Sequence, residues 1–255
     1  MKSQFDLAGK VALVTGASGG LGAHFAGFLA DSGASVVLAG RRLNVLEELA
    51  HEIIARGGKA HPQVMDVCDD TSVANGFEAA SRACGLIDVA VCNAGVALTR
   101  RAIELSPDEW DRVLGTNLSG CWRVAREAGQ RLVQASRPGA IINVTSILGH
   151  RVAAGVMPYA VAKAGLEHMT RCLALEWARY GIRVNALAPG YVDTPLNSDF
   201  FATDAGQALV ARVPMRRLGQ AEDLRAPLLL LASDDSAYMT GSTLVVDGGH
   251  LQSTL

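Results

Sequence analysis

Six short apolar runs recur along the chain, and each is nearly continuous in apolarity rather than alternating with polar positions. They cover residues 11–14, 35–39, 89–92, 141–144, 184–188 and 244–246. A strand that is covered on both faces, as in a parallel sheet, has this pattern, whereas a strand with one wet face alternates. The runs therefore predict buried parallel strands.

Longer segments with a helical period separate these runs. After the first run, apolar residues recur on one helical face at Leu21, Phe25, Phe28 and Leu29, and Gly33 is placed to end that helix. Alternation of strands and helices implies right-handed crossover connections. The pattern thus predicts an α/β fold, a Rossmann-type doubly wound parallel sheet with helices on both faces.

The length of 255 residues is compatible with one large domain, and no repeat, linker or low-complexity tract divides it. We therefore expect a single domain over residues 1–255. Residues 191–219 are weakly patterned and carry two prolines, two phenylalanines and scattered glycines. A long irregular segment in a compact domain is usually functional, so we predict a substrate lid here.

Composition excludes several function classes. The formal net charge is −2, which gives no electrostatic reason to bind nucleic acid or an anionic membrane. Five cysteines without CxxC spacing favour free thiols, and the N-terminus lacks the apolar stretch of a signal peptide. No apolar run approaches a membrane span, and the six histidines lack metal-ligand spacing. We expect a cytoplasmic protein without a metal site.

A glycine-rich loop, Thr-Gly-Ala-Ser-Gly-Gly-Leu-Gly, occupies residues 15–22 directly after the first predicted strand. Gly16 permits a sharp turn, while Gly20 and Gly22 remove side chains where a backbone must approach a pyrophosphate and where the helix packs on the strand. The following helix offers free N–H groups to phosphates. This strand–loop–helix context predicts a dinucleotide cofactor.

Taken together with motifs further along, the chain resembles the classical short-chain dehydrogenase/reductase family over about residues 7–249. The matching positions are Thr15-Gly16-x-x-x-Gly20-x-Gly22, Asp66-Val67, Asn93-Ala94-Gly95, Asn117, Ser146, Tyr159-x-x-x-Lys163, Asn185-x-x-x-Pro189-Gly190 with Thr194, and Asp247-Gly248-Gly249. The resemblance implies a seven-stranded sheet, a homotetramer or homodimer, and hydride transfer between a nicotinamide cofactor and a carbonyl or secondary alcohol.

The resemblance also implies which residues meet the cofactor. They are Gly16, Ser18, Gly20, Leu21, Gly22, Asp66, Val67, Asn93, Ala94, Gly95, Tyr159, Lys163, Pro189, Gly190, Val192 and Thr194. Within this set, residues 66–67 would contact the adenine and residues 93–95 would line the adenosine ribose. The segment 189–194 would orient the nicotinamide carboxamide.

Tyr159 and Lys163 are four residues apart, so they project from one face of a helix. A phenol is a poor base at neutral pH, but a neighbouring ammonium stabilises its phenolate form. Ser146 follows the strand run at 141–144, where it can hold a substrate oxygen. These three residues form the predicted catalytic set, and the resemblance adds Asn117 as a residue that helps to link Lys163 to solvent.

His150 lies four residues after Ser146, at the expected mouth of the pocket. Two interpretations stay open: it bonds a substrate, or it is a solvated loop histidine.

Cofactor preference depends on the end of the second predicted strand, which reads Leu38-Ala39-Gly40-Arg41-Arg42. An NAD-selective fold usually places a carboxylate here, about 20 residues after the glycine loop. None is present, and two guanidinium groups could receive a 2′-phosphate. We therefore predict NADP(H) over NAD(H), with Arg41 as the main contact because Arg42 should point along the next helix. Ser18, where NADP-preferring relatives often carry a second basic residue, argues the other way, and a solvated arginine pair would look the same.

Two rival functions have the same cofactor fold. One is a non-catalytic nicotinamide-binding regulatory protein, which would not need Ser146, Tyr159 and Lys163 together. The other is an epimerase or dehydratase, whose TGxxGxxG loop differs from the TGxxxGxG spacing here. Two long helical segments, 107–135 and 156–180, carry apolar residues on more than one face, and we expect a homo-oligomer, more specifically a tetramer.

Overall fold

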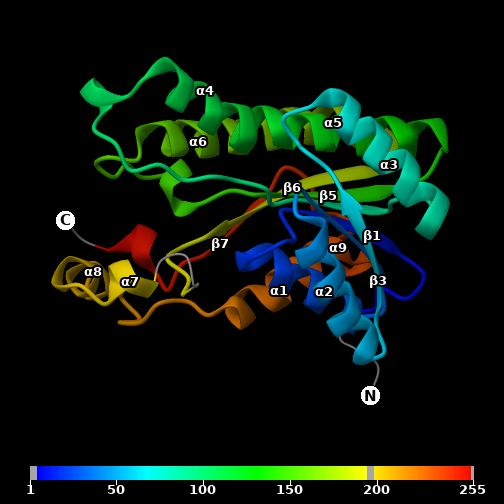
Figure 1. Ribbon diagram of the computed structural model, residues 1–255, viewed down its shortest axis with the longest axis horizontal. Coiled ribbons are helices and arrows are strands. Elements are labelled where there is room, and N and C mark those ends of the chain that lie inside the picture. The colour runs from blue at the N-terminus through cyan, green and yellow to red at the C-terminus, as the bar shows by residue number, and fades with distance from the viewer. Residues whose placement is uncertain (1–4, 194–197, 254–255) are drawn as a thin grey trace.

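The computed structural model describes residues 5–193 and 198–253, and these form a layered α/β structure around one parallel sheet (Figure 1). Its seven strands are β1 (Val11–Thr15), β2 (Ser35–Gly40), β3 (Lys59–Val64), β4 (Val89–Cys92), β5 (Gly139–Val144), β6 (Ile182–Pro189) and β7 (Thr243–Val246). The strand order is β3-β2-β1-β4-β5-β6-β7, and every pairing is parallel. The order reverses between β1 and β4, where such sheets open a binding crevice. The predicted doubly wound sheet is confirmed.

The apolar runs located six strands and missed β3. This strand lies at the edge of the sheet and pairs only with β2 among the described residues. It contains Pro62, which lacks an N–H donor, and none of its residues is fully buried. An edge strand of this composition has no apolar run to detect.

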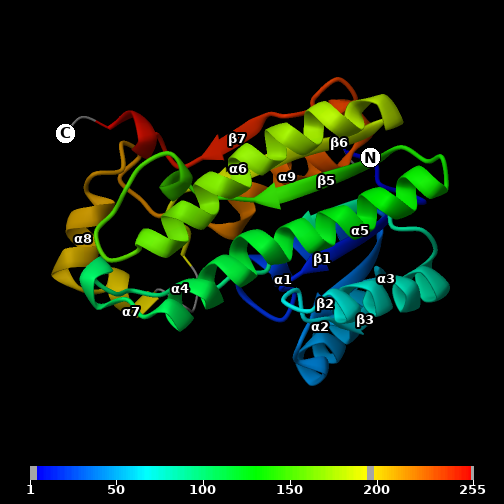
Figure 2. The same ribbon diagram turned by 90° about the horizontal axis from the view of Figure 1, so that it is seen from above.

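Helices cover both faces of the sheet, as Figures 1 and 2 show. One face carries α1 (Gly20–Asp31), α2 (Leu43–Ala55) and α9 (Arg225–Ala232). The other carries α3 (Asp70–Cys84), α5 (Cys121–Gln134) and α6 (Met157–Trp177). A shorter helix, α4 (Pro107–Leu114), runs through a π-helical segment, Gly115–Gly120, into α5. Two more, α7 (Ser198–Phe201) and α8 (Asp204–Val210), lie beside the C-terminal segment (Figure 1).

A separate apolar core fills each face. Phe25, Leu46 and Leu228 belong to the core under α1, α2 and α9, and Phe77 and Leu166 belong to the core under α3, α5 and α6. These side chains are all fully buried. Within the described part of the chain, no helix has the length and apolarity needed to cross a lipid bilayer.

The first backbone amides of the helices differ in whether a side chain caps them, and this difference affects the site. At α3 the Asp69 carboxylate accepts from two backbone amides, and at α4 Ser106 and Glu109 form a reciprocal capping box. The N-cap of α1 is Gly19, which provides no side-chain hydrogen bond. The first amides of α1 are therefore open to another acceptor.

Candidate active site

The glycine-rich loop after β1 is shaped by three glycines with different roles. Gly16 has φ of +69°, and a Cβ there would lie 2.9 Å from Ala94 Cα. A Cβ on Gly22 would overlap the Gly16 carbonyl oxygen, so helix and loop pack backbone to backbone. Gly20, with φ of +54°, has open space where its Cβ would project. An open surface beside the uncapped start of α1 fits a pyrophosphate.

Thr15 ties the two strands of the crevice together, a role that the sequence analysis did not assign. Its hydroxyl donates to the Val91 carbonyl at 3.2 Å and accepts from the amides of Asn93 and Ala94 at 3.0 and 3.1 Å. The Asn93 side chain returns a hydrogen bond to the Thr15 carbonyl at 3.0 Å. The carboxyl ends of β1 and β4 are thus held in one position beneath the glycine loop.

The residues after β3 line the same edge of the sheet. The Asp66 carboxylate accepts from the Cys68 amide at 2.9 Å, which turns the chain into α3. Val67 is buried, and a Cβ on Gly120 would lie 2.8 Å from its methyl group. Asp66 and Val67 therefore lie at the carboxyl end of β3, on the same edge of the sheet as the glycine loop.

Arg42, not Arg41, reaches the glycine loop. Its guanidinium donates to the Ser18 carbonyl at 2.7 Å and to the Ser18 hydroxyl at 3.2 Å. The expectation that Arg42 points along the following helix is wrong. Arg42 is the N-cap of α2, and its backbone, with φ of −99° and ψ of 89°, is not helical, so its side chain can turn back onto the glycine loop. Arg41 is exposed beside it.

The predicted catalytic residues come from two adjacent elements. Ser146 follows β5 and is buried, and its hydroxyl accepts from the Leu148 amide at 3.1 Å. Lys163 on α6 is also buried, and its ammonium donates to the Val144 carbonyl at 2.7 Å. The ammonium lies 5.5 Å from the ring centre of the half-buried Tyr159. One buried cation thus ties the helix to the strand that carries Ser146.

Asn117 lies in the π-helical segment between α4 and α5 and is fully buried. Its side chain accepts from the Val96 amide and donates to the Val96 carbonyl, both at 2.8 Å. A π-helical turn inside a helix is rare and often marks a functional site. Here it turns the Asn117 amide onto the segment that follows β4.

The segment after β6 closes the far side of the crevice. The Gly190 amide donates to the Val246 carbonyl at 2.9 Å, and a Cβ on Gly190 would lie 2.7 Å from Asp247. Pro189 ends β6, and Val192 forms a parallel bridge with Gly219. Thr194, also predicted to contact the cofactor, lies outside the described residues, while Leu21 packs against the core beneath the loop.

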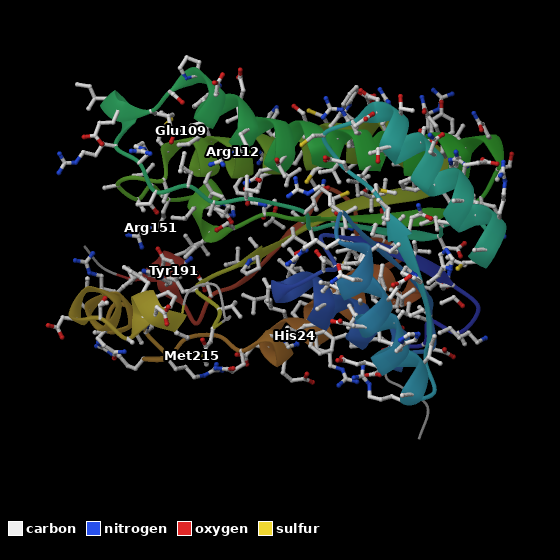
Figure 3. The ribbon with its side chains drawn as sticks, viewed as in Figure 1. His24, Glu109, Arg112, Arg151, Tyr191 and Met215 are labelled. Atoms are coloured by element: carbon white, nitrogen blue, oxygen red, sulfur yellow. The ribbon has the colours of Figure 1, made fainter. Side chains whose placement is uncertain are left out.

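Three aromatic rings form a group around Tyr191, which follows β6. The Tyr191 ring contacts those of Phe201 and His250 at centroid distances of 5.7 and 5.4 Å. Burial, and secondarily the charge of Tyr159, raises the pKa of Tyr191. Arg151 donates to the His250 carbonyl at 2.9 Å, and Figure 3 places Arg151 and Tyr191 on the same side of the molecule as α7 and α8.

His150 is paired with a buried carboxylate. Its Nε2 lies 2.7 Å from Oε1 of Glu167 on α6, whose side chain is 8% exposed. Neither of the two sequence-based interpretations, a substrate contact or a solvated loop residue, includes this ion pair between His150 and Glu167. Glu167 was not singled out from the sequence, although it follows Lys163 by four residues and therefore shares its helical face.

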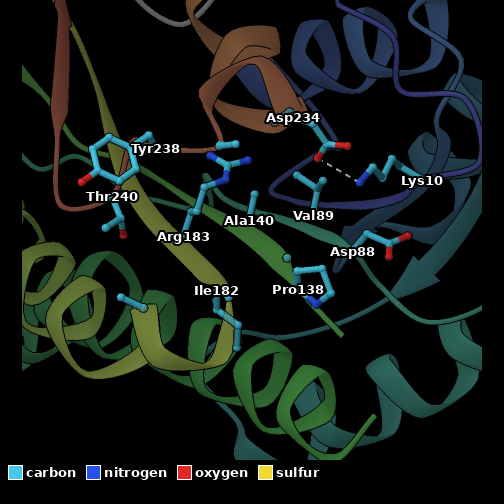
Figure 4. A pocket seen from close by; sticks show the side chains of 15 residues that line it. Lys10, Asp88, Val89, Pro138, Ala140, Ile182, Arg183, Asp234, Tyr238 and Thr240 are labelled. Atoms are coloured by element: carbon cyan, nitrogen blue, oxygen red, sulfur yellow. Dashed lines mark hydrogen bonds and ion pairs between the residues drawn. The ribbon is translucent and has the colours of Figure 1, made fainter. Parts of the chain in front are cut away.

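A cavity of about 550 Å³ lies at the opposite, amino-terminal edge of the strands (Figure 4). Its charged side chains already have partners: Lys10 bonds Asp234 at 3.1 Å, and Arg183 donates to the Leu231 and Ser233 carbonyls. Because ligands of open α/β sheets bind at the carboxyl ends of the strands, the crevice and not this cavity is the candidate active site. In the described ranges no group of three or more His, Cys, Asp or Glu residues could hold a metal ion.

Comparison with known proteins agrees with this geometry. A family model described as enoyl-(acyl carrier protein) reductase matches residues 16–250. The chain is 39% identical to a 3-oxoacyl-(acyl-carrier-protein) reductase of Pseudomonas aeruginosa, covering 97% of this chain and all of that one. It is 35% identical to gluconate 5-dehydrogenase of Gluconobacter oxydans, covering 96% of each chain.

A solved structure of similar shape is that of gluconate 5-dehydrogenase from Burkholderia cenocepacia in complex with NADP and tartrate. It has 33% identity and a TM-score of 0.94 and covers 98% of both chains. Together these matches span nearly the whole length of the chain. The chain belongs to the short-chain dehydrogenase/reductase family. It is an NAD(P)-dependent oxidoreductase that acts on CH–OH and C=O groups.

Proposed function

We propose that Tyr159, Lys163 and Ser146, with Asn117, form the catalytic group of an NADP(H)-preferring reductase or dehydrogenase for small-molecule carbonyl compounds and secondary alcohols. The bound nicotinamide supplies or accepts the hydride. Tyr159 transfers the proton at the substrate oxygen, and Ser146 holds that oxygen and stabilises its developing charge. Lys163 favours the phenolate of Tyr159.

One observation carries this proposal, namely the burial of the Lys163 ammonium. Removing an ammonium from water is costly unless it is well paired. Lys163 is 3% exposed, its ammonium donates to the Val144 carbonyl, and it lies beside the Tyr159 ring. An ammonium buried beside a phenol is placed to stabilise negative charge on the phenol oxygen, which supports a catalytic role for Lys163.

Loss of the Tyr159 hydroxyl tests the proposal. Tyr159→Phe should lower kcat by at least about 100-fold, within the range for general acid–base catalysis, while the cofactor still binds. The assay follows reduction of acetoacetyl-coenzyme A, a 3-oxoacyl thioester, with NADPH, and oxidation of gluconate with NADP⁺. These probes represent the substrate classes in the relatives' names. Lys163→Ala should impair both kcat and cofactor affinity. Near-normal turnover by Tyr159→Phe would refute the assignment.

The preference for NADP(H) is supported by the residues after β2. No carboxylate follows that strand, and the Arg42 guanidinium lies on the glycine loop. The similar structure from Burkholderia cenocepacia was solved with NADP. NAD(H) is the alternative cofactor.

We further propose a single domain over residues 1–255, with 191–219 as a substrate lid, assembled into a homotetramer in the cytoplasm. The pairing of Val192 with Gly219 closes the base of the proposed lid, and α7 and α8 lie within it. The homotetramer is supported by apolar side chains that α5 and α6 leave exposed.

A further inference from the structure

One buried carboxylate near the site has no role in the proposed chemistry. Glu167 continues the helical face of Tyr159 and Lys163 by one turn. Its Oε1 lies 2.7 Å from His150 Nε2 and accepts a hydrogen bond from the Thr145 hydroxyl at 3.3 Å. A polar group therefore extends behind the catalytic residues, between α6 and the end of β5.

The buried carboxylate of Glu167 needs these two partners to stabilise its charge. A buried carboxylate loses its hydration and must recover that free energy from charge or hydrogen bonds. Burial raises the pKa of Glu167, while the charge of His150, the Thr145 hydrogen bond and the charge of Arg171 act in the opposite direction. Of these groups, His150 makes the closest contact.

These two contacts of Glu167, with His150 and with Thr145, both come from the chain around Ser146. Thr145 immediately precedes Ser146, and His150 follows it by four residues. The turn between them, Ile147–Gly149, lies flat on α6, since a Cβ on Gly149 would be 3.1 Å from the Lys163 carbonyl carbon. Glu167 therefore bonds both ends of the segment that carries Ser146, Thr145 before it and His150 after it.

We propose that His150 is a positioning residue, which fixes the Ser146 loop on the helix that carries Tyr159 and Lys163 through its contact with Glu167. This inference rests on the proposed function, because His150 acts through Ser146. Its Nε2 is engaged by Glu167, so we assign it no direct contact with substrate. The alignment of Ser146 with Tyr159 then depends on a residue outside the catalytic set.

The first test removes the contact and then restores it. His150→Ala should lower kcat by about tenfold, because small misplacements of catalytic groups have effects of this order or larger. The KM for NADPH should stay within about twofold, since the cofactor cradle is built from other elements. His150→Gln retains an N–H donor and should recover kcat to within about threefold of the wild type. Unchanged kcat in His150→Ala, or no recovery in His150→Gln, would overturn the proposal.

A matched control is available on the same helix. His168 is adjacent to Glu167 but exposed, and its Nδ1 contacts Arg171 at 3.3 Å. His168→Ala should leave kcat within about twofold of the wild type, since substitutions of exposed side chains usually have small effects. An equal loss in His168→Ala and His150→Ala would contradict a specific role for His150.

A double-mutant cycle separates positioning from folding. If His150 acts through Ser146, the variant Ser146→Ala/His150→Ala should lose less than about twofold in kcat relative to Ser146→Ala alone. A further tenfold loss would mean that the two residues act independently and would refute the proposal. Wild-type kcat in Ser146→Ala would instead refute the proposed function itself. Thermal melting of each variant verifies that it is folded.

Discussion

At the residue scale, the guanidinium of Arg42 lies on the glycine loop, and we expect it to meet the 2′-phosphate of NADP(H). It spans the loop at Ser18 and lies 3.6 Å from where a Cβ on Gly19 would be. It partly fills the role that a basic residue at position 18 would have. Arg41 is exposed at the same end of β2, and we expect it to contact the same 2′-phosphate.

The cofactor prediction follows from these two arginines. Wild-type kcat/KM should favour NADPH over NADH by roughly ten- to a hundredfold, because a hydrogen bond to a charged group contributes about 1.5–3 kcal/mol. Arg41→Asp should reverse the order by repelling the phosphate. Arg42→Ala should reduce the preference without reversing it.

Arg82→Ala is the matched control for these variants. Arg82 pairs with Glu78 on the surface of α3, and its removal should leave the cofactor ratio unchanged. All measurements use one salt concentration, because screening weakens exposed charge contacts. A wild-type preference for NADH would disprove the assignment.

Some residues of the site can be predicted from spacing and some cannot. Tyr159 and Lys163 need only a helix to share a face, and the glycines of the loop need only a strand and a helix on either side. The partner of Glu167 depends instead on the path of a loop, because His150 reaches it from the Ser146 turn. The prediction of where the Arg42 side chain points was wrong for the same reason, because contacts between distant parts of the chain determine that direction.

At the scale of elements, the apolar periodicity of the sequence does not predict the π-helical turn between α4 and α5. The apolar pattern of residues 107–135 predicts one continuous helix, and the structure has α4, the π-helical segment and α5 in its place. Within the π-helical segment, the Asn117 side chain makes two hydrogen bonds with Val96. Those bonds connect distant parts of the chain, so no local pattern reports them.

A second element-scale feature is the turn before α9, at the base of the proposed lid. Arg217 donates two hydrogen bonds to Asp223, at 2.6 and 3.0 Å, and Asp223 also accepts from the Gln220 amide at 2.8 Å. The Arg217 bonds and then the backbone bond lower the pKa of Asp223 to about 2. The Gly219 amide within this turn bonds Tyr191 and so links the turn to the lid.

These bonds predict a pH-dependent contribution to stability. A carboxyl group with a lowered pKa stabilises the folded state above its unfolded value, 3.8, and the effect is lost as pH falls toward 2. Asp223→Asn should lower the Tm by about 1–3 °C at pH 7, since the pair is partly exposed.

The difference in Tm between Asp223→Asn and wild type should narrow below about pH 4, because the unfolded state then binds a proton at Asp223 that the folded state does not bind until about pH 2. Asp31→Asn, at the exposed end of α1, serves as the control and should give a difference that does not narrow in this way. A constant Tm difference for Asp223→Asn from pH 7 to pH 3 would contradict the assignment.

At the scale of the whole molecule, α5 and α6 leave several apolar side chains exposed on their outer faces. These helices lie side by side on one face of the sheet (Figure 2). Leu175 is 84% exposed, and Val161 and Trp122 are about 40% exposed. Exposed apolar side chains in neighbouring helices mark a surface that association can cover.

We therefore expect light scattering to give about four times the 26.7 kDa protomer mass at micromolar concentration. Val161→Lys/Leu175→Lys should lower that mass, since a charge within an apolar contact is destabilising. Ile54→Lys on α2 is the control, because Ile54 is also exposed but lies on the other face of the sheet. A monomeric wild-type mass would exclude the homotetramer.

The crossover between β1 and β4 also constrains the order in which the molecule can fold. Val11 and Asp88, bonded across these strands, are 77 residues apart in the chain. Such long-range parallel pairings form slowly, because loop closure must precede the contacts that reward it. Thr15 and Asn93 stand on opposite sides of this pairing. We therefore expect the proposed nucleotide cradle to form late in folding, once β1 and β4 have paired.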